Sequence, residues 1–301
     1  MEASIHETTQ KRIAVVTGAN KGIGLEICRQ LSAKGVKVLL TARDVERGTA
    51  AVKKLLEEGA SDVVFHQLDV ADSASVASLA NYIHTHFGRL DILINNAAVG
   101  GVELKPEALT LLDQQQQVAF STLVDMRLES HEKAEECINI NYYGTKRMCE
   151  ALISLLRLSQ SPKIIILSSE LGRLQYIPGE NIRKEIANIN DLTEERLDRL
   201  VESFLNDFRE EKLEENGWPA SGSAYIVSKI ALTAYTRILA KVYPTICINC
   251  VNPGFVKTDI NWNTGTRTVE EGAKGPVMLA LLPNDSPSGL FYCQTEVSSF
   301  E

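Results

Sequence analysis

A glycine-rich turn between a β-branched segment and an amphipathic helix restricts the fold of this chain more than any other feature. Residues 12–17 read R-I-A-V-V-T, a pattern typical of a strand that is buried on both faces. The turn G-A-N-K-G-I-G follows at once, and Ile23, Ile27 and Leu31 then recur at helical spacing. A strand, a glycine turn and a helix in this order predict the start of a dinucleotide-binding βαβ unit.

The glycines of this turn fit the chemistry of a nucleotide phosphate. Small residues let the backbone approach a pyrophosphate, and the helix N-terminus presents free N–H groups and positive potential. The spacing is G-x-x-x-G-x-G, which differs from the commoner G-x-G-x-x-G. Cofactor contacts are expected from Gly18, Asn20, Lys21, Gly22, Ile23 and Gly24.

Strands and helices alternate along the rest of the chain. We expect strands at 37–42, 63–67, 92–95, 163–167, 246–251 and 289–293, and helices at 44–58, 73–87, 223–243 and 269–282. The pattern predicts an α/β fold: a Rossmann-type doubly wound parallel sheet, with residues 1–301 in a single domain.

Ligands of such a fold bind at the carboxyl ends of the strands. Asp69, Val70 and Asn96 lie just past strand ends, where a dinucleotide would pass. Residues 100–128 are irregular and glutamine-rich, and we expect a loop with one helical turn there. A helix that carries Asn141 and runs to about residue 158 is expected next.

Arg43 ends the second predicted strand, where a carboxylate would bind a ribose 2′-hydroxyl. An arginine at this place accommodates a 2′-phosphate, and Lys21 adds a second positive charge nearby. These two cations favour NADPH/NADP+ over NAD(H). The alternative is that both are solvated surface charges, with Asp44 as the ion-pair partner of Arg43.

Composition excludes several classes of partner. The formal net charge of −8 argues against a nucleic acid or an anionic membrane, since either requires a basic face. No apolar run approaches the ~20 residues of a membrane span. The first twelve residues are polar and lack the apolar core of a signal peptide, so a cytoplasmic location is expected.

The cysteines and histidines predict no metal site. Cys247 and Cys250 form a C-x-x-C in an apparent strand, where residues i and i+3 point to opposite faces, and no second pair supplies further ligands. We expect buried free thiols. His84 and His86 are two residues apart on a predicted helix and therefore diverge.

Residues 221–229 read S-G-S-A-Y-I-V-S-K and place a phenol and an ammonium one helical turn apart. On a helix, Tyr225 and Lys229 share a face. A neighbouring positive charge favours the phenolate, so the pKa of Tyr225 is expected to fall towards neutrality. Ser169 follows the strand 163–167, where a substrate carbonyl can accept its hydroxyl proton.

Six motifs in order resemble the short-chain dehydrogenase/reductase superfamily over nearly the whole chain. They are T-G-A-N-K-G-I-G, N-N-A-A, I-N-Y-Y-G, S-S-E-L-G, Y-I-V-S-K and N-P-G-F-V-K-T. The stretches L-T-A-R-D-V-E-R-G and F-H-Q-L-D-V look like carbonyl reductases. L-T-E-E-R, N-G-W-P and C-V-N-P-G are similar to the plant salutaridine reductase and menthone (neomenthol) reductase group.

The resemblance implies a catalytic tetrad of Asn141, Ser169, Tyr225 and Lys229. By that resemblance Tyr225 protonates the ketone oxygen while NADPH delivers hydride, and Ser169 orients the oxygen. Lys229 lowers the tyrosine pKa and holds the nicotinamide ribose, and Asn141 orders a water that feeds protons to Lys229. The S-x-x-G spacing to Gly172 selects Ser169 over Ser168, which is then structural.

The resemblance also implies cofactor contacts after the strand 246–251. Pro253 and Gly254 are expected along the nicotinamide, and Val256 and Thr258 at its carboxamide and the pyrophosphate. Trp262 and Asn263 are a candidate lid. The chain departs from the family at N-N-A-A, where Ala98 replaces the usual glycine, and in the unusually long separation of Ser169 from Tyr225.

A helical insert at about 179–218 accounts for that separation. Its apolar stripe comprises Leu197, Leu200, Val201, Phe204, Leu205 and Phe208. A helix with such a stripe must bury it, with Asp191 or Thr193 as the N-cap. In the monomeric reductases that the chain resembles, a comparable insert covers the helices that otherwise form the dimer interface, so a monomer is expected. The insert is also expected to wall the substrate pocket with Trp218 or Tyr176, although both could equally be core residues.

The predicted function is reduction of a bulky apolar ketone, such as a terpenoid or alkaloid, by NADPH, running in reverse as an alcohol dehydrogenase. One alternative is reduction of a conjugated C=C bond, as in the isopiperitenone reductases of the same group; those lack the catalytic tyrosine. A second is a non-catalytic NADP(H)-sensing protein, against which the four intact tetrad residues argue.

Overall fold

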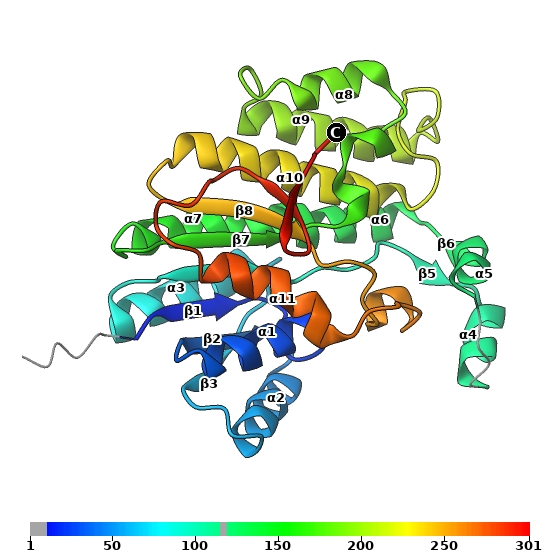
Figure 1. Cartoon of the computed structure of the whole chain (residues 1–301). Helices are drawn as coiled ribbons and strands as arrows, with labels where there is room; N and C mark the ends of the chain where they lie inside the picture. The colour runs from blue at the N-terminus through cyan, green and yellow to red at the C-terminus, as the bar shows by residue number, and fades with distance from the viewer. Residues whose placement is uncertain (1–10, 115–118) are drawn as a thin grey trace, which may run out of the picture.

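A mostly parallel sheet organises the chain, as the alternating pattern predicted. The computed structural model describes residues 11–114 and 119–301. Its main sheet has eight strands in the order β10-β9-β8-β7-β4-β1-β2-β3, and only β10 runs antiparallel to its neighbour. Figure 1 shows β8, β7, β1, β2 and β3 of this sheet from top to bottom. The strands are β1 (Ile13–Val16), β2 (Lys37–Ala42), β3 (Val63–Gln67), β4 (Ile92–Asn95), β7 (Lys163–Leu167), β8 (Cys247–Asn252), β9 (Phe291–Cys293) and β10 (Glu296–Ser298).

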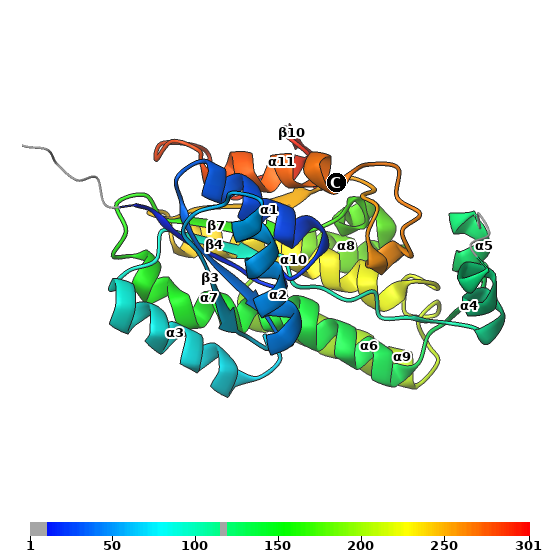
Figure 2. The same cartoon turned by 90° about the horizontal axis from the view of Figure 1, so that it is seen from below.

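Helices cover both faces of this sheet. One face packs against α1 (Gly22–Ala33), α2 (Val45–Glu57) and α11 (Val269–Ala280). The other packs against α3 (Ser73–Phe87), α6 (His131–Ile138), α7 (Gly144–Leu156) and α10 (Ser223–Val242), and Figure 2 shows the two layers on opposite sides of the strands. The apolar side chains of the strands fill both interfaces because a strand in the interior of a parallel sheet is buried on both faces.

The sequence located most of these elements to within one or two residues. Strand β8 begins and ends one residue later than expected, and α11 ends at Ala280 instead of residue 282. Strand β10 was not predicted, because it is only three residues long and mostly exposed, so it shows no apolar alternation; it pairs with β9 across a two-residue turn. The first twelve residues, in which no signal peptide was expected, lie largely outside the described residues.

The prediction of a loop with one helical turn for residues 100–128 was wrong. A two-stranded ribbon of β5 (Glu103–Leu104) and β6 (Arg127–Leu128) encloses the short helices α4 (Pro106–Asp113) and α5 (Phe120–Asp125). We call the described residues 103–114 and 119–130 the flap. Leu104, Ala108 and Leu123 form a small core of their own, which stabilises these elements although each is short. Residues 115–118, which include much of the glutamine run, lie outside the described residues.

The helix that carries Asn141 is interrupted. Asn139–Tyr143 form a π-helical turn (η1) between α6 and α7, and Asn141 lies within it. A π turn inserts one extra residue per turn and often occurs at functional sites. Residues 129–143 contain no glycine or proline that would mark the change.

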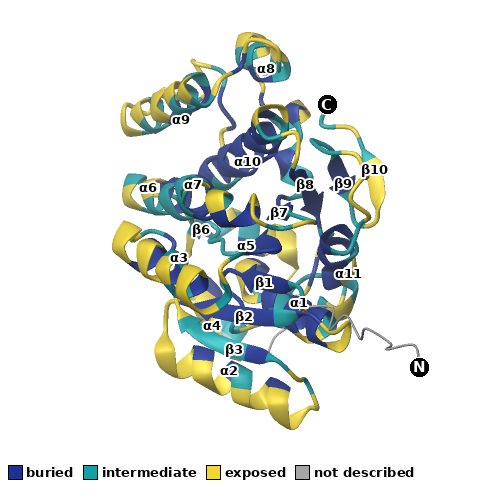
Figure 3. Cartoon of the chain, turned by 90° about the vertical axis from the view of Figure 1, so that its left-hand side faces the viewer, coloured by how far each residue is buried: buried dark blue, intermediate teal, exposed yellow. Residues whose placement is uncertain are grey.

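The insert forms a second layer on α10 and α6. It contains α8 (Glu180–Ala187) and α9 (Glu194–Arg209), and Thr193, not Asp191, caps α9 by accepting a hydrogen bond from the Arg196 N–H. Figure 3 shows that α9 lies on the outer side of α10. Helix α10 is buried along almost its whole length. The predicted apolar stripe is therefore buried against α10 and α6, as its periodicity required.

A polar cluster joins the insert to the sheet layer. Asp198 on α9 accepts hydrogen bonds from the Tyr142 hydroxyl at 2.8 Å and from the Lys146 ammonium. Glu194 lies 3.6 Å from the same ammonium. Burial raises the pKa of Tyr142, and the neighbouring Asp198 carboxylate raises it further. The insert is thus held by charge-assisted hydrogen bonds as well as by apolar contacts.

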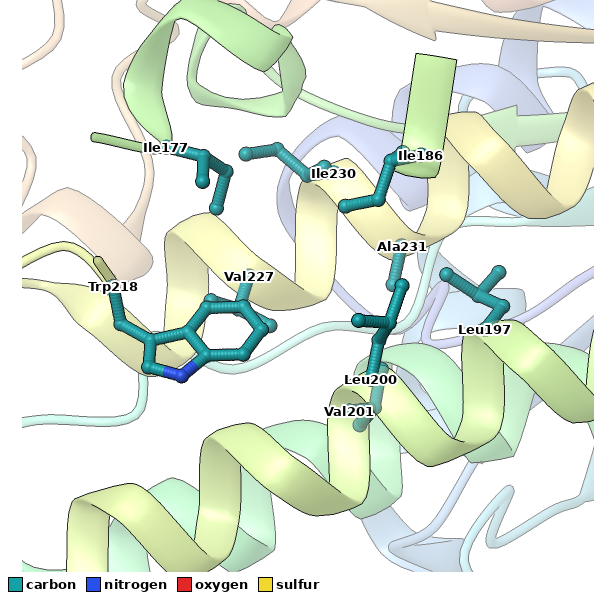
Figure 4. Close-up of a pocket in the computed structure, with 9 residues that line it drawn as sticks. All are labelled: Ile177, Ile186, Leu197, Leu200, Val201, Trp218, Val227, Ile230 and Ala231. Atoms are coloured by element: carbon teal, nitrogen blue, oxygen red, sulfur yellow. The ribbon is translucent and has the colours of Figure 1, made fainter. Parts of the chain in front are cut away.

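A cavity of about 10 Å³ lies between the insert and α10, and aliphatic and aromatic side chains line it (Figure 4). Leu197, Leu200 and Val201 line it from α9, and Trp218 closes one end. The Trp218 side chain is 3% exposed and its indole N–H donates to Asp207 at 2.7 Å. Trp218 is therefore a core residue of the insert, which is one of the two alternatives that the sequence left open for it. Tyr176 is half-buried beside the same core.

Two expectations of the sequence about metals and membranes can be checked on the described residues. Cys247 and Cys250 are both buried with free thiols, as expected. Within residues 11–114 and 119–301 no group of three or more His, Cys, Asp or Glu side chains is arranged to hold a metal ion. No helix in that part of the chain is long and apolar enough to cross a membrane.

Candidate active site

The glycine-rich turn packs directly onto the segment that follows β4. A Cβ atom on Gly18 would lie 2.9 Å from the Ala97 Cα, and one on Gly24 would lie 2.5 Å from the Asn96 Nδ2. Asn96 donates hydrogen bonds from Nδ2 to the Thr17 carbonyl at 2.8 Å and the Gly18 carbonyl at 3.1 Å. Gly18 and Gly24 therefore have no room for a Cβ atom. Without side chains at these positions, the backbone of the turn stays accessible to a ligand at the start of α1. This geometry fits a dinucleotide pyrophosphate.

Lys21 at the start of α1 has a partner that the sequence did not reveal. Its ammonium forms an ion pair with Asp259, which follows β8, and this pair lowers the pKa of the Asp259 carboxyl. Both side chains are more than half exposed, so the pair contributes little to stability. Lys21 therefore joins the glycine turn to the segment after β8. Its expected role as a second cation for a 2′-phosphate stays a prediction.

Arg43 lies at the carboxyl end of β2 and is exposed. The suggested ion pair between Arg43 and Asp44 does not form. Asp44 instead caps α2 by accepting from the Arg47 N–H at 2.9 Å, and its carboxylate lies 3.8 Å from the Arg47 guanidinium. Among the residues that the structure describes, no acidic side chain is paired with Arg43, whose guanidinium is free to meet an anion.

Asp69 and Val70, two of the expected cofactor contacts, differ in their accessibility. Asp69 is half-buried and its Oδ1 accepts a hydrogen bond from the Ala71 N–H at 2.9 Å. The Val70 side chain is 7% exposed and packs on Gly144, where a Cβ would lie 2.8 Å from it. A contact between Val70 and a cofactor would therefore involve its backbone, because the side chain is committed to the core.

The segment after β8 is tightly folded. Gly254 has φ +88°, which favours glycine, and its N–H donates to the Asn252 side chain at 2.9 Å. Pro253 is half-buried, and the buried Val256 packs against Gly272 of α11. Thr258 forms a reciprocal capping box with Asn261. These contacts hold the segment beside the glycine turn, to which the Lys21–Asp259 ion pair also connects it.

Tyr225, Lys229 and Ser169 meet where α10 crosses the carboxyl end of β7. The Ser169 side chain lies near enough to the Tyr225 hydroxyl to lower the pKa of the phenol. The Lys229 ammonium lies 5.4 Å from the centre of the Tyr225 ring and donates to the Leu167 carbonyl at 2.8 Å. The predicted shared helix face and the predicted strand end thus do bring these three groups together.

Asn141 joins this group through Ser228, a residue that the sequence analysis did not single out. Its Nδ2 donates to the Ser228 hydroxyl at 3.0 Å, and the Ser228 hydroxyl donates to the Tyr225 carbonyl at 2.8 Å. Its Oδ1 accepts from the Val99 N–H at 2.8 Å. Asn141 therefore ties the π turn to α10 and to the segment after β4. Ser228 is three residues after Tyr225, a helical spacing that could have indicated it.

Burial dominates the protonation of the central pair. It raises the pKa of Tyr225 to about 12, although the hydrogen bond from Ser169 partly opposes the shift. It lowers the pKa of Lys229 to about 8, and the nearby Cys137 thiol opposes that shift. The expectation that Lys229 brings the pKa of Tyr225 towards neutrality is wrong for this structure. Removal from water disfavours the charged phenolate, and this effect is the largest cause of the shift.

Ser168 is structural, as the motif spacing indicated. Its hydroxyl lies 3.1 Å from the Lys229 carbonyl and 2.9 Å from the Thr233 hydroxyl, and its side chain is buried. A Cβ on Gly172 would lie 2.2 Å from the Ser168 oxygen, which explains the glycine of S-S-E-L-G. Ser169 points instead to Tyr225.

Aromatic side chains join the flap to the segment after β8. The Phe120 ring of α5 lies 5.0 Å from the ring of Phe255 and 6.2 Å from that of Trp262. Phe120 and Phe255 are 39% and 38% exposed, so an apolar surface remains open to solvent beside the candidate cofactor site. Trp262 and Asn263, the expected lid residues, both adopt left-handed backbone conformations.

Comparison with known proteins agrees with the resemblance drawn from the motifs. The family described as short chain dehydrogenase matches residues 12–181. Short-chain dehydrogenase/reductase 1 of Saponaria officinalis is 52% identical over 294 residues, which cover 97% of each chain. The (+)-neomenthol dehydrogenase of Arabidopsis thaliana is 50% identical over 293 residues, covering 96% of this chain and 98% of that protein.

The fold agrees equally well with a solved structure. Salutaridine reductase from Papaver somniferum superposes with a TM-score of 0.89 at 47% sequence identity, covering 94% of this chain and 99% of that one. The family match includes the glycine turn and Ser169, and the relatives extend over Tyr225 and Lys229 as well. The chain therefore belongs to the short-chain dehydrogenase family of oxidoreductases.

Proposed function

We propose that this protein reduces a bulky apolar ketone with NADPH, and oxidises the corresponding alcohol in reverse, with Tyr225 as the proton donor. The observation that carries the proposal is the half-buried Tyr225, whose hydroxyl lies near the Ser169 side chain and whose ring lies 5.4 Å from the Lys229 ammonium. The relatives named neomenthol dehydrogenase and salutaridine reductase support a terpenoid or alkaloid as the substrate class. The exposed aromatic surface of Phe120 and Phe255 supports an apolar substrate.

The proposed cofactor residues surround the carboxyl ends of the strands. NADPH, when bound, supplies the hydride. The backbone of the glycine turn and the N-terminus of α1 would hold its pyrophosphate, and Arg43 its 2′-phosphate. The remaining proposed contacts are Asn20, Ile23, Asp69, Val70, Asn96, Pro253, Gly254, Val256 and Thr258, together with Tyr225 and Lys229.

Each residue of the proposed tetrad has its own part in the proton transfer. A phenol with a pKa near 12 is protonated at physiological pH, so Tyr225 can donate its proton to the ketone oxygen. The Ser169 hydroxyl holds that oxygen by a hydrogen bond. The Lys229 ammonium then stabilises the phenolate that remains, and Asn141 fixes α10 through Ser228.

Tyr225→Phe tests the reaction directly. Loss of the proton donor should lower kcat for ketone reduction by at least about a hundredfold. The dissociation constant of NADPH should stay nearly unchanged, because the ring remains. Both are measured by following NADPH oxidation and NADPH fluorescence with a panel of terpenoid and alkaloid ketones and enones. Tyr243→Phe at the other end of α10 is the control. Full turnover by Tyr225→Phe, or reduction confined to the C=C bond of enones, would contradict the proposal.

The pH profile tests the role of Lys229. The ammonium carries its charge below a pKa of about 8 and loses it above, whereas Tyr225 stays protonated up to about 12. We therefore expect kcat/KM for reduction to be constant at lower pH and to fall as pH rises through about 8. Steady-state rates at saturating NADPH between about pH 6 and 10 measure it. A profile that rises through this range would refute the assignment.

Arg43→Asp tests the cofactor preference. A charge-assisted hydrogen bond to the 2′-phosphate would be lost and a repulsive carboxylate introduced, so the dissociation constant of NADPH should rise by about tenfold to a hundredfold. The constant for NADH should not rise. Arg47→Asp, an exposed arginine one turn into α2, provides the matched control. Equal effects of the two variants on NADPH binding would argue against Arg43.

We further propose that the protein is a monomer in solution. The insert lies on α10 and α6, and its anchors Asp198 and Trp218 are engaged within the chain. A second copy could not pack on these two helices without displacing α9. Sedimentation velocity should give a single species near the 33.2 kDa chain mass, and a stable dimer would contradict the proposal.

A further inference from the structure

Tyr225 lies in the first turn of α10, which is the part of a helix that frays most easily. The helix begins at Ser223, so Tyr225 is its third residue. The first N–H groups of any helix have no partner within the helix. Gly222 at the cap has φ +62° and no side chain to satisfy them. The first turn of α10 therefore needs hydrogen-bond acceptors from elsewhere in the chain.

Glu129 supplies these acceptors from 93 residues earlier. Its Oε1 accepts a hydrogen bond from the Gly222 N–H at 2.5 Å, and its Oε2 accepts from the Ser223 N–H and the Ser223 hydroxyl at 3.3 Å each. A carboxylate at a helix N-terminus makes charge-assisted hydrogen bonds and meets the positive end of the helix dipole. Both of its oxygens are thus engaged by the start of α10.

A second flap residue strengthens this connection. Arg127 donates from one guanidinium nitrogen to the Ser221 hydroxyl at 3.1 Å and from Nε to the Val124 carbonyl at 3.2 Å. Arg127 and Glu129 thereby hold the residues on both sides of the Gly222 turn. The other end of the same flap contacts Phe255 and Trp262 through Phe120. The flap therefore links the segment after β8 to the first turn of α10.

Glu129 is half-buried and lines an open surface groove of about 520 Å³. Because water reaches this groove, the hydrogen bonds of Glu129 are worth much less to overall stability than buried ones would be. Their effect is concentrated on the few residues that they hold. Those residues immediately precede Tyr225.

We infer that Glu129 is a positioning residue for the reaction, acting through the backbone of residues 222–225 to hold the Tyr225 hydroxyl in place for proton transfer. Glu129 does not touch the reacting atoms. The inference rests on the proposed role of Tyr225 as proton donor. It goes beyond that role by assigning a catalytic contribution to the flap.

Glu129→Ala, Glu129→Gln and the control Glu215→Ala are compared in the full chain. Glu215 is an exposed acidic residue on the same groove. We expect Glu129→Ala to lower kcat by about tenfold to a hundredfold, since a small displacement of a reacting group has effects of that size. The dissociation constant of NADPH should change by less than about twofold, since Glu129 lies outside the proposed cofactor contacts. Glu129→Gln keeps one acceptor oxygen and should recover part of the loss, and Glu215→Ala should behave as wild type.

A double-mutant cycle separates positioning from general destabilisation. In a Tyr225→Phe background, Glu129→Ala should cause no further loss of kcat, because the group that it positions is already gone. Full additivity of the two losses would overturn the inference. If Tyr225→Phe is inactive while Glu129→Ala turns over like wild type, the inference fails and the proposed function stands. If wild type reduces no ketone, the proposed function itself fails.

Amide hydrogen exchange tests the structural half of the inference without any substrate. Peptides that cover residues 222–226 should exchange at least about tenfold faster in Glu129→Ala than in wild type or Glu215→Ala. Peptides from the middle of α10 should be unchanged. Equal exchange in the first turn of all three proteins would overturn the inference, even where kcat differs.

Discussion

The crossing of α10 over the carboxyl end of β7 is the contact on which the candidate site depends. The Lys229 ammonium donates to the Leu167 carbonyl, and the Ser168 hydroxyl lies within hydrogen-bond distance of the Lys229 carbonyl. These bonds fix the second turn of α10 relative to β7, the strand that Ser169 follows. Because Gly172 has no side chain, the helix can approach so closely. The meeting of Tyr225 with Ser169 follows from this packing.

The same burial that positions the pair also sets its electrostatics. Removal from water disfavours the charged form of each group, so the pKa of Tyr225 rises and that of Lys229 falls. A tyrosine that remains a phenol is suited to giving up a proton. A lysine with a pKa near 8 remains mostly charged at neutral pH while lying close to its titration range. Both properties follow from the depth of the site, and neither requires an ion pair.

Two added segments extend the parallel-sheet core, and they serve different parts of it. The insert buries an apolar stripe on the outer side of α10 and is anchored by Asp198, with Trp218 in its own core. The insert therefore stabilises α10 from its outer side. The flap reaches the front of the same helix, where Glu129 accepts hydrogen bonds from its first residues. The helix that carries Tyr225 and Lys229 is thus held by segments from both sides.

Local patterns in the sequence determined the parallel sheet, the glycine turn and the helical insert. They also singled out Ser169, Tyr225 and Lys229 as candidate site residues. These features depend on residues only a few positions apart, so periodicity and motif spacing reveal them. The structure of the flap escaped this reading, because its short helices are stabilised by packing of Leu104, Ala108 and Leu123 across the segment. Tertiary structure alone decided that Lys21 pairs with Asp259, 238 residues away, and that Glu129 caps α10. It also decided the direction of the pKa shift of Tyr225, because desolvation depends on everything that surrounds a side chain and not on its neighbours in the chain.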